Sequence, residues 1–165
     1  MIPSKKMTAM LNKQMNAEFY NSHLYLAMAA WFEAQNLFGF ASWMEVQAEE
    51  ERGHALRFYK HLKERRAGVS VGDVPAVPTK YKDALDAMTA AFNHEVHVSE
   101  EINRLMAAAS AEQDYAAAQM LQWFVSEQVE EEANTDVIVQ QLKMAGESKG
   151  ALMQIDHHLG KRKQG

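Results

Sequence analysis

The sequence contains no cysteine, which excludes disulfide scaffolds, zinc–thiolate sites, iron–sulfur clusters and thiol catalysis. Proline, which breaks helices, occurs only at Pro3, Pro75 and Pro78. The longest apolar run, residues 24–32, is too short to span a membrane, and residues 1–10 hold no apolar core long enough for a signal peptide. We therefore expect a cytoplasmic protein without a membrane partner.

Charge and composition are those of an ordinary soluble globular protein. Hydrophobic residues make up 47% of the 165-residue chain and charged residues 24%. The net charge of −5 gives no basic surface for nucleic acid, so no nucleic-acid partner is expected. The length fits a single domain, residues 1–165, with a sizeable core.

The segments between the prolines are rich in Ala, Met, Leu, Glu, Gln and Lys, which favour helices, and few segments alternate as strands do. The sequence therefore predicts an all-α fold. Asp114 is a candidate N-cap for the fourth helix, which Gly146 ends. The predicted helices cover about residues 6–35, 40–66, 82–110, 115–145 and 148–159.

The links between the predicted helices differ in length. Short links join the first helix to the second and the third to the fourth, whereas the Gly- and Pro-containing segment 67–80 forms a long crossover between the second and third. Helices of about 28 residues would each be about 42 Å long. This pattern predicts a tall four-helix bundle with a long crossover and a short fifth, C-terminal helix.

Heptad spacing predicts which acidic residues face the core, because residues seven apart share a helix face. In each long helix one stripe is apolar at both ends and polar near the middle. The central polar residues are Glu18 in the first helix, Gln47, Glu51 and His54 in the second, Glu95 in the third, and Gln128 and Glu131 in the fourth. These side chains are expected to meet at one level inside the bundle.

The predicted polar layer contains no lysine or arginine. Clustered buried carboxylates repel one another, so either several are protonated or a cation lies among them. Carboxylate oxygens with one imidazole and no sulfur suit iron(II) or manganese, and two bridging metals would cancel most of the charge. The alternative is that one or more stripes are mis-phased and that these glutamates pair with lysines at the edge of the bundle.

Four segments around these residues are highly specific as a set: MNAEFYNSHLY (15–25), AEEERGH (48–54), FNHEVHVSEEIN (92–103) and LQWFVSEQVEEE (121–132). With these segments the chain resembles the bacterial non-haem ferritins over nearly its full length. The resemblance implies a ferritin-like four-helix bundle whose subunits form a homo-oligomeric shell, a 24-mer. It further implies a ferroxidase that oxidises iron(II) with dioxygen or peroxide and stores the ferric mineral in the shell cavity.

The resemblance also implies roles for individual residues. One iron site would comprise Glu18, Glu51 and His54. The other would comprise Glu51, Glu95 and Glu131, with Gln128 nearby. An accessory third iron site would comprise Glu50, Glu127 and Glu130. Tyr25 matches the tyrosine beside the di-iron centre and is either an electron donor or a packed core tyrosine bonded to a glutamate.

Two departures argue against the haem-containing relatives. Residues 131–134 lack the histidine of a second Glu-x-x-His pair, and Arg52 stands where bacterioferritin has its haem-ligand methionine. No haem is therefore expected. Two other functions stay open: a non-catalytic structural four-helix bundle whose acids form salt bridges, and a di-iron oxygenase acting on an organic substrate.

Three further residues give weaker expectations. His94 and His97 flank Glu95 and are expected to point away from the core as surface histidines. Gly53 lies inside the second helix, where glycine costs about 1 kcal/mol relative to alanine. A close approach of a neighbouring helix is one explanation for this glycine.

Overall fold

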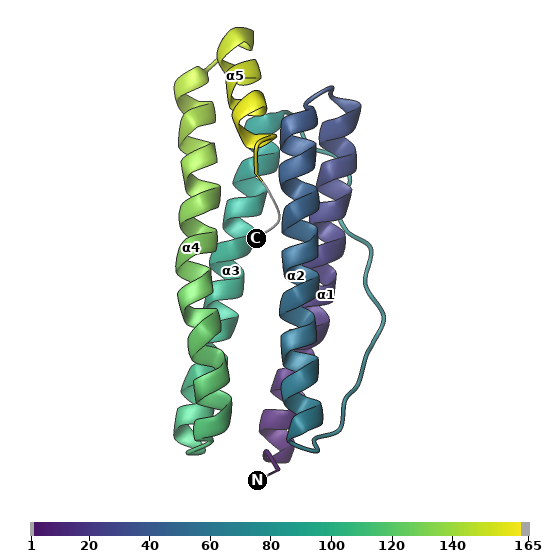
Figure 1. Cartoon of the computed structure of the whole chain (residues 1–165), viewed down its shortest axis with the longest axis vertical. Helices are drawn as coiled ribbons and strands as arrows, with labels where there is room; N and C mark the ends of the chain where they lie inside the picture. The colour runs from purple at the N-terminus through teal and green to yellow at the C-terminus, as the bar shows by residue number, and fades with distance from the viewer. Residues whose placement is uncertain (1, 163–165) are drawn as a thin grey trace.

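The computed structural model describes residues 2–162, and within that range it consists of five α-helices without strands (Figure 1). The all-α prediction is confirmed, and every helix begins and ends within two residues of its predicted range. The helices are α1 (Lys5–Ala34), α2 (Phe38–Glu64), α3 (Ala84–Ala111), α4 (Tyr115–Ala145) and α5 (Lys149–Leu159).

Capping side chains explain where four of the helices begin. In each case a serine or aspartate accepts a hydrogen bond from a backbone N–H in the first turn, which has no partner within the helix. The pairs are Ser4 with Met7, Asp83 with Asp86, Asp114 with Ala117 and Ser148 with Ala151. The N-cap predicted at Asp114 is therefore confirmed. Gly146 ends α4 with a φ of 54°, which glycine adopts readily.

The long helices pack as two neighbouring pairs, α1 with α2 and α3 with α4, and the crossover between α2 and α3 runs along the length of the bundle (Figure 1). Two asparagines of α1 hold this crossover. Asn12 Nδ2 donates to the carbonyl of Gly68 at 2.8 Å, and Asn16 Nδ2 donates to the carbonyl of Ser70 at 2.8 Å. A segment without secondary structure of its own thereby gains fixed partners for its backbone groups.

The core consists of two apolar clusters, with polar residues between them along every long helix. One cluster includes Phe32 and Phe40, whose rings stack 4.8 Å apart, and the other includes Phe58 and Phe124, whose rings stack 4.4 Å apart. The buried polar residues of the layer between them are Gln14, Glu18, Asn21, Gln47, Glu51, His54, Glu95, Gln128, Glu131 and Thr135. The apolar clusters thus shield this layer from water above and below.

The fifth helix packs against α2 and α4 at one end of the bundle (Figure 1). Leu159 is buried, and Leu152 and Ile155 pack partly against the same apolar cluster. A Cβ on Gly39 would lie 1.7 Å from the carbonyl oxygen of Asp156, so only glycine permits this approach of α5 to α2. The Phe40 N–H also donates to Asp156 Oδ1 at 2.9 Å, which fixes α5 near the start of α2.

Gly53 is exposed, and a Cβ built there would meet no atom within 4 Å among the described residues. The suggested close approach of a neighbouring helix is therefore wrong within the chain. The structure offers no account of this glycine. In the part of the chain that the structure describes, none of the helices is long and apolar enough to cross a membrane.

Candidate metal centre

Each of the four long helices contributes one deeply buried glutamate to the polar layer. The exposed fractions of these residues lie between 0% and 3%. The residues are Glu18 on α1, Glu51 on α2, Glu95 on α3 and Glu131 on α4. The heptad stripes correctly predicted that these side chains face inward, so the alternative of edge glutamates paired with lysine is wrong for all four.

Glu18, Glu51 and His54 form the most compact group of candidate ligands. All three are buried, and one ligand atom from each lies within 4.8 Å of the others. The Nδ1 atom of His54 lies 3.3 Å from Glu51 Oε2. Because α2 contributes both members of the Glu-x-x-His pair and α1 the third residue, the tight packing of these two helices sets the group's geometry.

Two amide side chains of α1 orient Glu18. Gln14 Nε2 donates to Glu18 Oε1 at 2.8 Å, and Asn21 Nδ2 donates to Glu18 Oε2 at 2.8 Å and to Glu51 Oε2 at 3.3 Å. Sequence reasoning missed both residues, although their spacing of four before and three after Glu18 places them on its helix face. They hold the carboxyl groups without cancelling their charge.

His94 is not the surface histidine that the sequence predicted. It is half-buried, and its Nε2 lies 2.7 Å from Asn21 Oδ1. Because the Asn21 amide N–H donates to Glu18, its oxygen accepts, and His94 therefore carries a proton on Nε2. Burial lowers the pKa of His94 to about 4, so the ring is neutral at pH 7. His97, in contrast, is exposed as expected.

The second half of the layer is held by hydrogen bonds to the other two glutamates. The Tyr25 hydroxyl donates to Glu95 Oε1, and Gln128 Nε2 donates to Glu95 Oε2 at 3.1 Å. Gln47 Nε2 donates to Glu131 Oε2 at 2.7 Å and to Glu51 Oε1 at 3.4 Å. Gln47 thus bridges two carboxyl groups that come from α2 and α4.

A second group of candidate ligands lies on the α2 and α4 side, where His54, Glu127 and Glu131 offer ligand atoms within 4.8 Å of one another. Among the described residues, Glu95 is a member of neither of these two groups. The His54 ring is enclosed by Trp123 and Phe124, with ring centroids 5.4 and 5.7 Å away.

The three residues implied for an accessory site are less buried than the central glutamates. Glu127 is half-buried and Glu130 is exposed. Glu50 is half-buried and pairs with Arg162, whose Nη2 lies 2.5 Å from Glu50 Oε2. The sequence did not predict an arginine near this layer. Arg162 comes from beyond the end of α5.

Burial raises the pKa of every central glutamate above the ordinary value of 4.5. The pKa of Glu18 is raised well above it by burial and then by Glu51, and that of Glu51 by burial and then by Glu95 and Glu131. Burial and the carboxyl group of Glu95 raise the pKa of Glu131 to about 8. Burial raises the pKa of Glu95, although the hydrogen bonds from Tyr25 and Gln128 oppose this. At neutral pH the layer without metal therefore holds protons.

The donor set fits hard or borderline divalent cations. Oxygen atoms dominate, one imidazole nitrogen is available, and the sequence contains no thiolate. Iron(II) and manganese(II) prefer such ligands. Because ligating carboxylates must lose their protons, a cation that binds here replaces the protons that the buried glutamates carry.

A family model described as a ferritin-like domain matches residues 8–145 of the chain. The chain belongs to the ferritin family. It is 39% identical over 159 residues to a protein named bacterial non-heme ferritin from Bacteroides fragilis, covering 96% of this chain and 99% of that relative. A probable bacterial non-heme ferritin-like protein from Haemophilus influenzae is 36% identical over 157 residues, covering 95% of each chain.

Solved structures support the same assignment. An open pore ferritin from the archaeon Archaeoglobus fulgidus superposes with a TM-score of 0.96 at 41% identity, covering 97% of this chain and 98% of that one. An engineered closed form of the Archaeoglobus fulgidus ferritin also gives a TM-score of 0.96, at 40% identity over 98% of each chain. The predicted family and ferritin-like fold are confirmed. Membership of this family supports iron storage, and the Glu/His group is compatible with a ferroxidase centre.

Proposed function

We propose that this ferritin oxidises iron(II) at a di-iron centre within each subunit and stores the ferric product. The observation that supports this most directly is the compact, buried group of Glu18, Glu51 and His54. In this proposal iron is the substrate and the cargo, and no haem takes part. The whole chain, residues 1–165, acts as a single ferritin-like domain.

The first iron(II) ion binds Glu18, Glu51 and His54. The second binds Glu51, Glu95 and Glu131, with Gln128 nearby. In the structure, the second-site residue Glu95 accepts hydrogen bonds from Tyr25 and Gln128, and Glu131 accepts one from Gln47. Binding of the second ion therefore requires these hydrogen bonds to rearrange, whereas the first three ligands already lie together.

The reaction balances with two iron(II) ions and one dioxygen molecule. Each iron ion loses one electron, and dioxygen takes up two electrons and two protons to leave as hydrogen peroxide. With peroxide as the oxidant, two iron(II) ions each give one electron to a hydrogen peroxide molecule, which takes up two protons and leaves as two water molecules. The protons that the buried glutamates release on metal binding are available for either step. The protein contributes fixed ligand geometry and a pocket that excludes water.

Two further roles belong to this proposal. Tyr25, buried and hydrogen-bonded to Glu95, is suited to supply an electron to an oxygen species at the centre. Glu50, Glu127 and Glu130 form an accessory third site on the α2 and α4 side. The placement of Glu127 beside His54 and Glu131 supports a route from the centre towards that site.

We further propose that the subunits assemble into a homo-oligomeric shell of 24 copies with a mineral-filled cavity. The similarity to ferritins over nearly the whole chain supports this assembly. A cytoplasmic location remains a prediction.

Stopped-flow absorbance after mixing iron-free protein with iron(II) and dioxygen tests the catalytic part. We expect Glu51→Ala to lose most of the fast oxidation, because Glu51 is proposed to bind both ions. Glu49→Ala is the matched control, since Glu49 lies two residues earlier on the same helix but is exposed. If Glu51→Ala oxidises iron as fast as Glu49→Ala, the centre is wrongly assigned.

Iron loading combined with mass determination tests the storage part. A storage shell takes up far more iron per chain than the proposed sites can hold, and it elutes as a very large particle. A small oligomer that binds no iron would instead indicate a structural four-helix bundle.

A further inference from the structure

Arg162 places a permanent positive charge on the α2 and α4 side of the metal centre. Its Nη2 donates to Glu50 Oε2 at 2.5 Å, and its Nη1 donates to Gln47 Oε1 at 2.9 Å. The guanidinium carbon also lies 4.5 Å from the centre of the Trp43 ring. Three separate contacts therefore hold this side chain, and its exposed fraction is only 20%.

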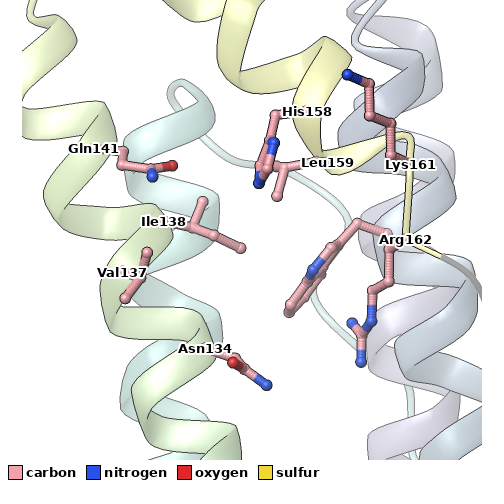
Figure 2. A pocket seen from close by; sticks show the side chains of 9 residues that line it. Asn134, Val137, Ile138, Gln141, His158, Leu159, Lys161 and Arg162 are labelled. Carbon is pink, nitrogen blue, oxygen red and sulfur yellow. The ribbon is translucent and has the colours of Figure 1, made fainter. Parts of the chain in front are cut away.

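The same side chain lines a cavity of about 450 Å³ between α2, α4 and the end of α5. Figure 2 shows Val137 and Ile138 of α4 on one side of this cavity and Arg162 on the other. The side chain of Lys161 points away from the guanidinium of Arg162. Room therefore exists for the arginine to leave Glu50 without displacing a helix.

The contact with Gln47 connects Arg162 to the central carboxyl groups. Because the Gln47 oxygen accepts from the arginine, its amide nitrogen is turned towards Glu131 and Glu51. A guanidinium group is charged at every accessible pH and offers several donors in a fixed plane, which suits this two-point contact. Arg162 is thus a positioning residue for Gln47 and a counter-charge for Glu50.

We propose that Arg162 is a built-in cation that occupies the accessory metal position at Glu50, and that a divalent cation binding there must displace it. This inference rests on the proposed accessory site at Glu50, Glu127 and Glu130. It assigns to the C-terminal segment the regulation of that site. When Arg162 is seated, Glu50 is neutralised and Gln47 is fixed. When a cation takes its place, Gln47 is released from its contact with the arginine.

Calorimetric titration of the assembled, iron-free protein with zinc(II), which undergoes no redox reaction, tests this proposal. Glu50→Gln should remove one class of bound zinc and thereby identify the accessory site. Arg162→Ala should tighten that same class about fivefold, which is the effect of one partly exposed ion pair that no longer has to be broken. In the double variant, which lacks both Glu50 and Arg162, this gain should vanish.

Lys161→Ala is the matched control, because it removes one positive charge from the neighbouring residue without touching Glu50. It should leave the Glu50-dependent class unchanged, and size-exclusion chromatography should show that every variant assembles as the wild type does. Equal zinc affinities for Arg162→Ala and Lys161→Ala would overturn the proposal while leaving the accessory site in place. If Glu50→Gln removes no class of zinc, the accessory site and this inference both fail, whereas the test of Glu51 in iron oxidation stands separately.

Discussion

Replacing Glu131 with glutamine tests the conclusion that the metal-free centre stores protons. Burial and the neighbouring carboxyl of Glu95 raise the pKa of Glu131 from the ordinary 4.5 to about 8 in the folded protein. The folded state therefore binds this proton more tightly than the unfolded state does. The stability that the Glu131 proton gives the folded state is fully present below pH 4.5, declines as the pH rises from 4.5 to about 8, and is lost above that range.

The size of the effect follows from the shift. Each pKa unit corresponds to about 1.4 kcal/mol, so Glu131 alone accounts for a loss of at most about 5 kcal/mol per chain across the range. A change of 1 kcal/mol shifts the unfolding midpoint of a domain of this size by about 2–4 °C. Glu131 alone should therefore lower the midpoint of the metal-free wild type by about 3–5 °C per pH unit between pH 5.5 and 7.5, and the other buried glutamates add to this slope.

Differential scanning calorimetry of the chelator-treated protein measures this slope. Glu131→Gln should flatten it, because glutamine keeps the shape and cannot titrate. Glu49→Gln, which changes an exposed glutamate, should retain the wild-type slope. Equal slopes for the two variants would refute the argument that the Glu131 proton stabilises the metal-free fold.

Three further substitutions probe the packing around the site, each measured by denaturant unfolding of the metal-free protein. Gly39→Ala should destabilise the protein by about 1–3 kcal/mol, because the new methyl group would collide with the Asp156 carbonyl. Limited proteolysis should then also cut α5 more readily, and unchanged protection of α5 from the protease would disprove the close approach. Gly53→Ala should stabilise it by about 1 kcal/mol, since the site is open and helical; a loss of stability would indicate a contact with another copy. Tyr25→Phe should cost about 1–3 kcal/mol, because Glu95 loses a buried donor; wild-type stability would show that this hydrogen bond contributes little.

The fold was predictable because its signals are local and repeated. The start of α4 after Asp114 and its end at Gly146 each depend on a few neighbouring residues. Heptad spacing correctly predicted that all four central glutamates are buried. Heptad spacing was least accurate in α3, where it also placed Leu85 and Phe92 on the core-facing stripe although both are only half-buried.

The contacts around the acids were less predictable, because they depend on how side chains meet across helices. The position of His94 one residue before Glu95 suggested an outward direction, but α1 approaches closely enough for its ring to reach Asn21. Arg162 lies 112 residues beyond Glu50, and no periodic pattern connects the two. The hydrogen-bond partners Gln14 and Asn21 were accessible from helical spacing alone, but only once Glu18 was known to face inward.

The side chains around the four glutamates orient the carboxyl groups without neutralising their charge. Gln14, Asn21, Gln47 and Gln128 hold the carboxyl groups by neutral amides, and His94 beside them is also neutral at pH 7. A buried lysine or arginine at any of these positions would orient a carboxylate equally well, but it would remain as a permanent competitor for a metal. Protons, in contrast, leave when a cation arrives. Arg162, which pairs with Glu50 and Gln47, lies beyond the last helix, where it can withdraw without unwinding the bundle.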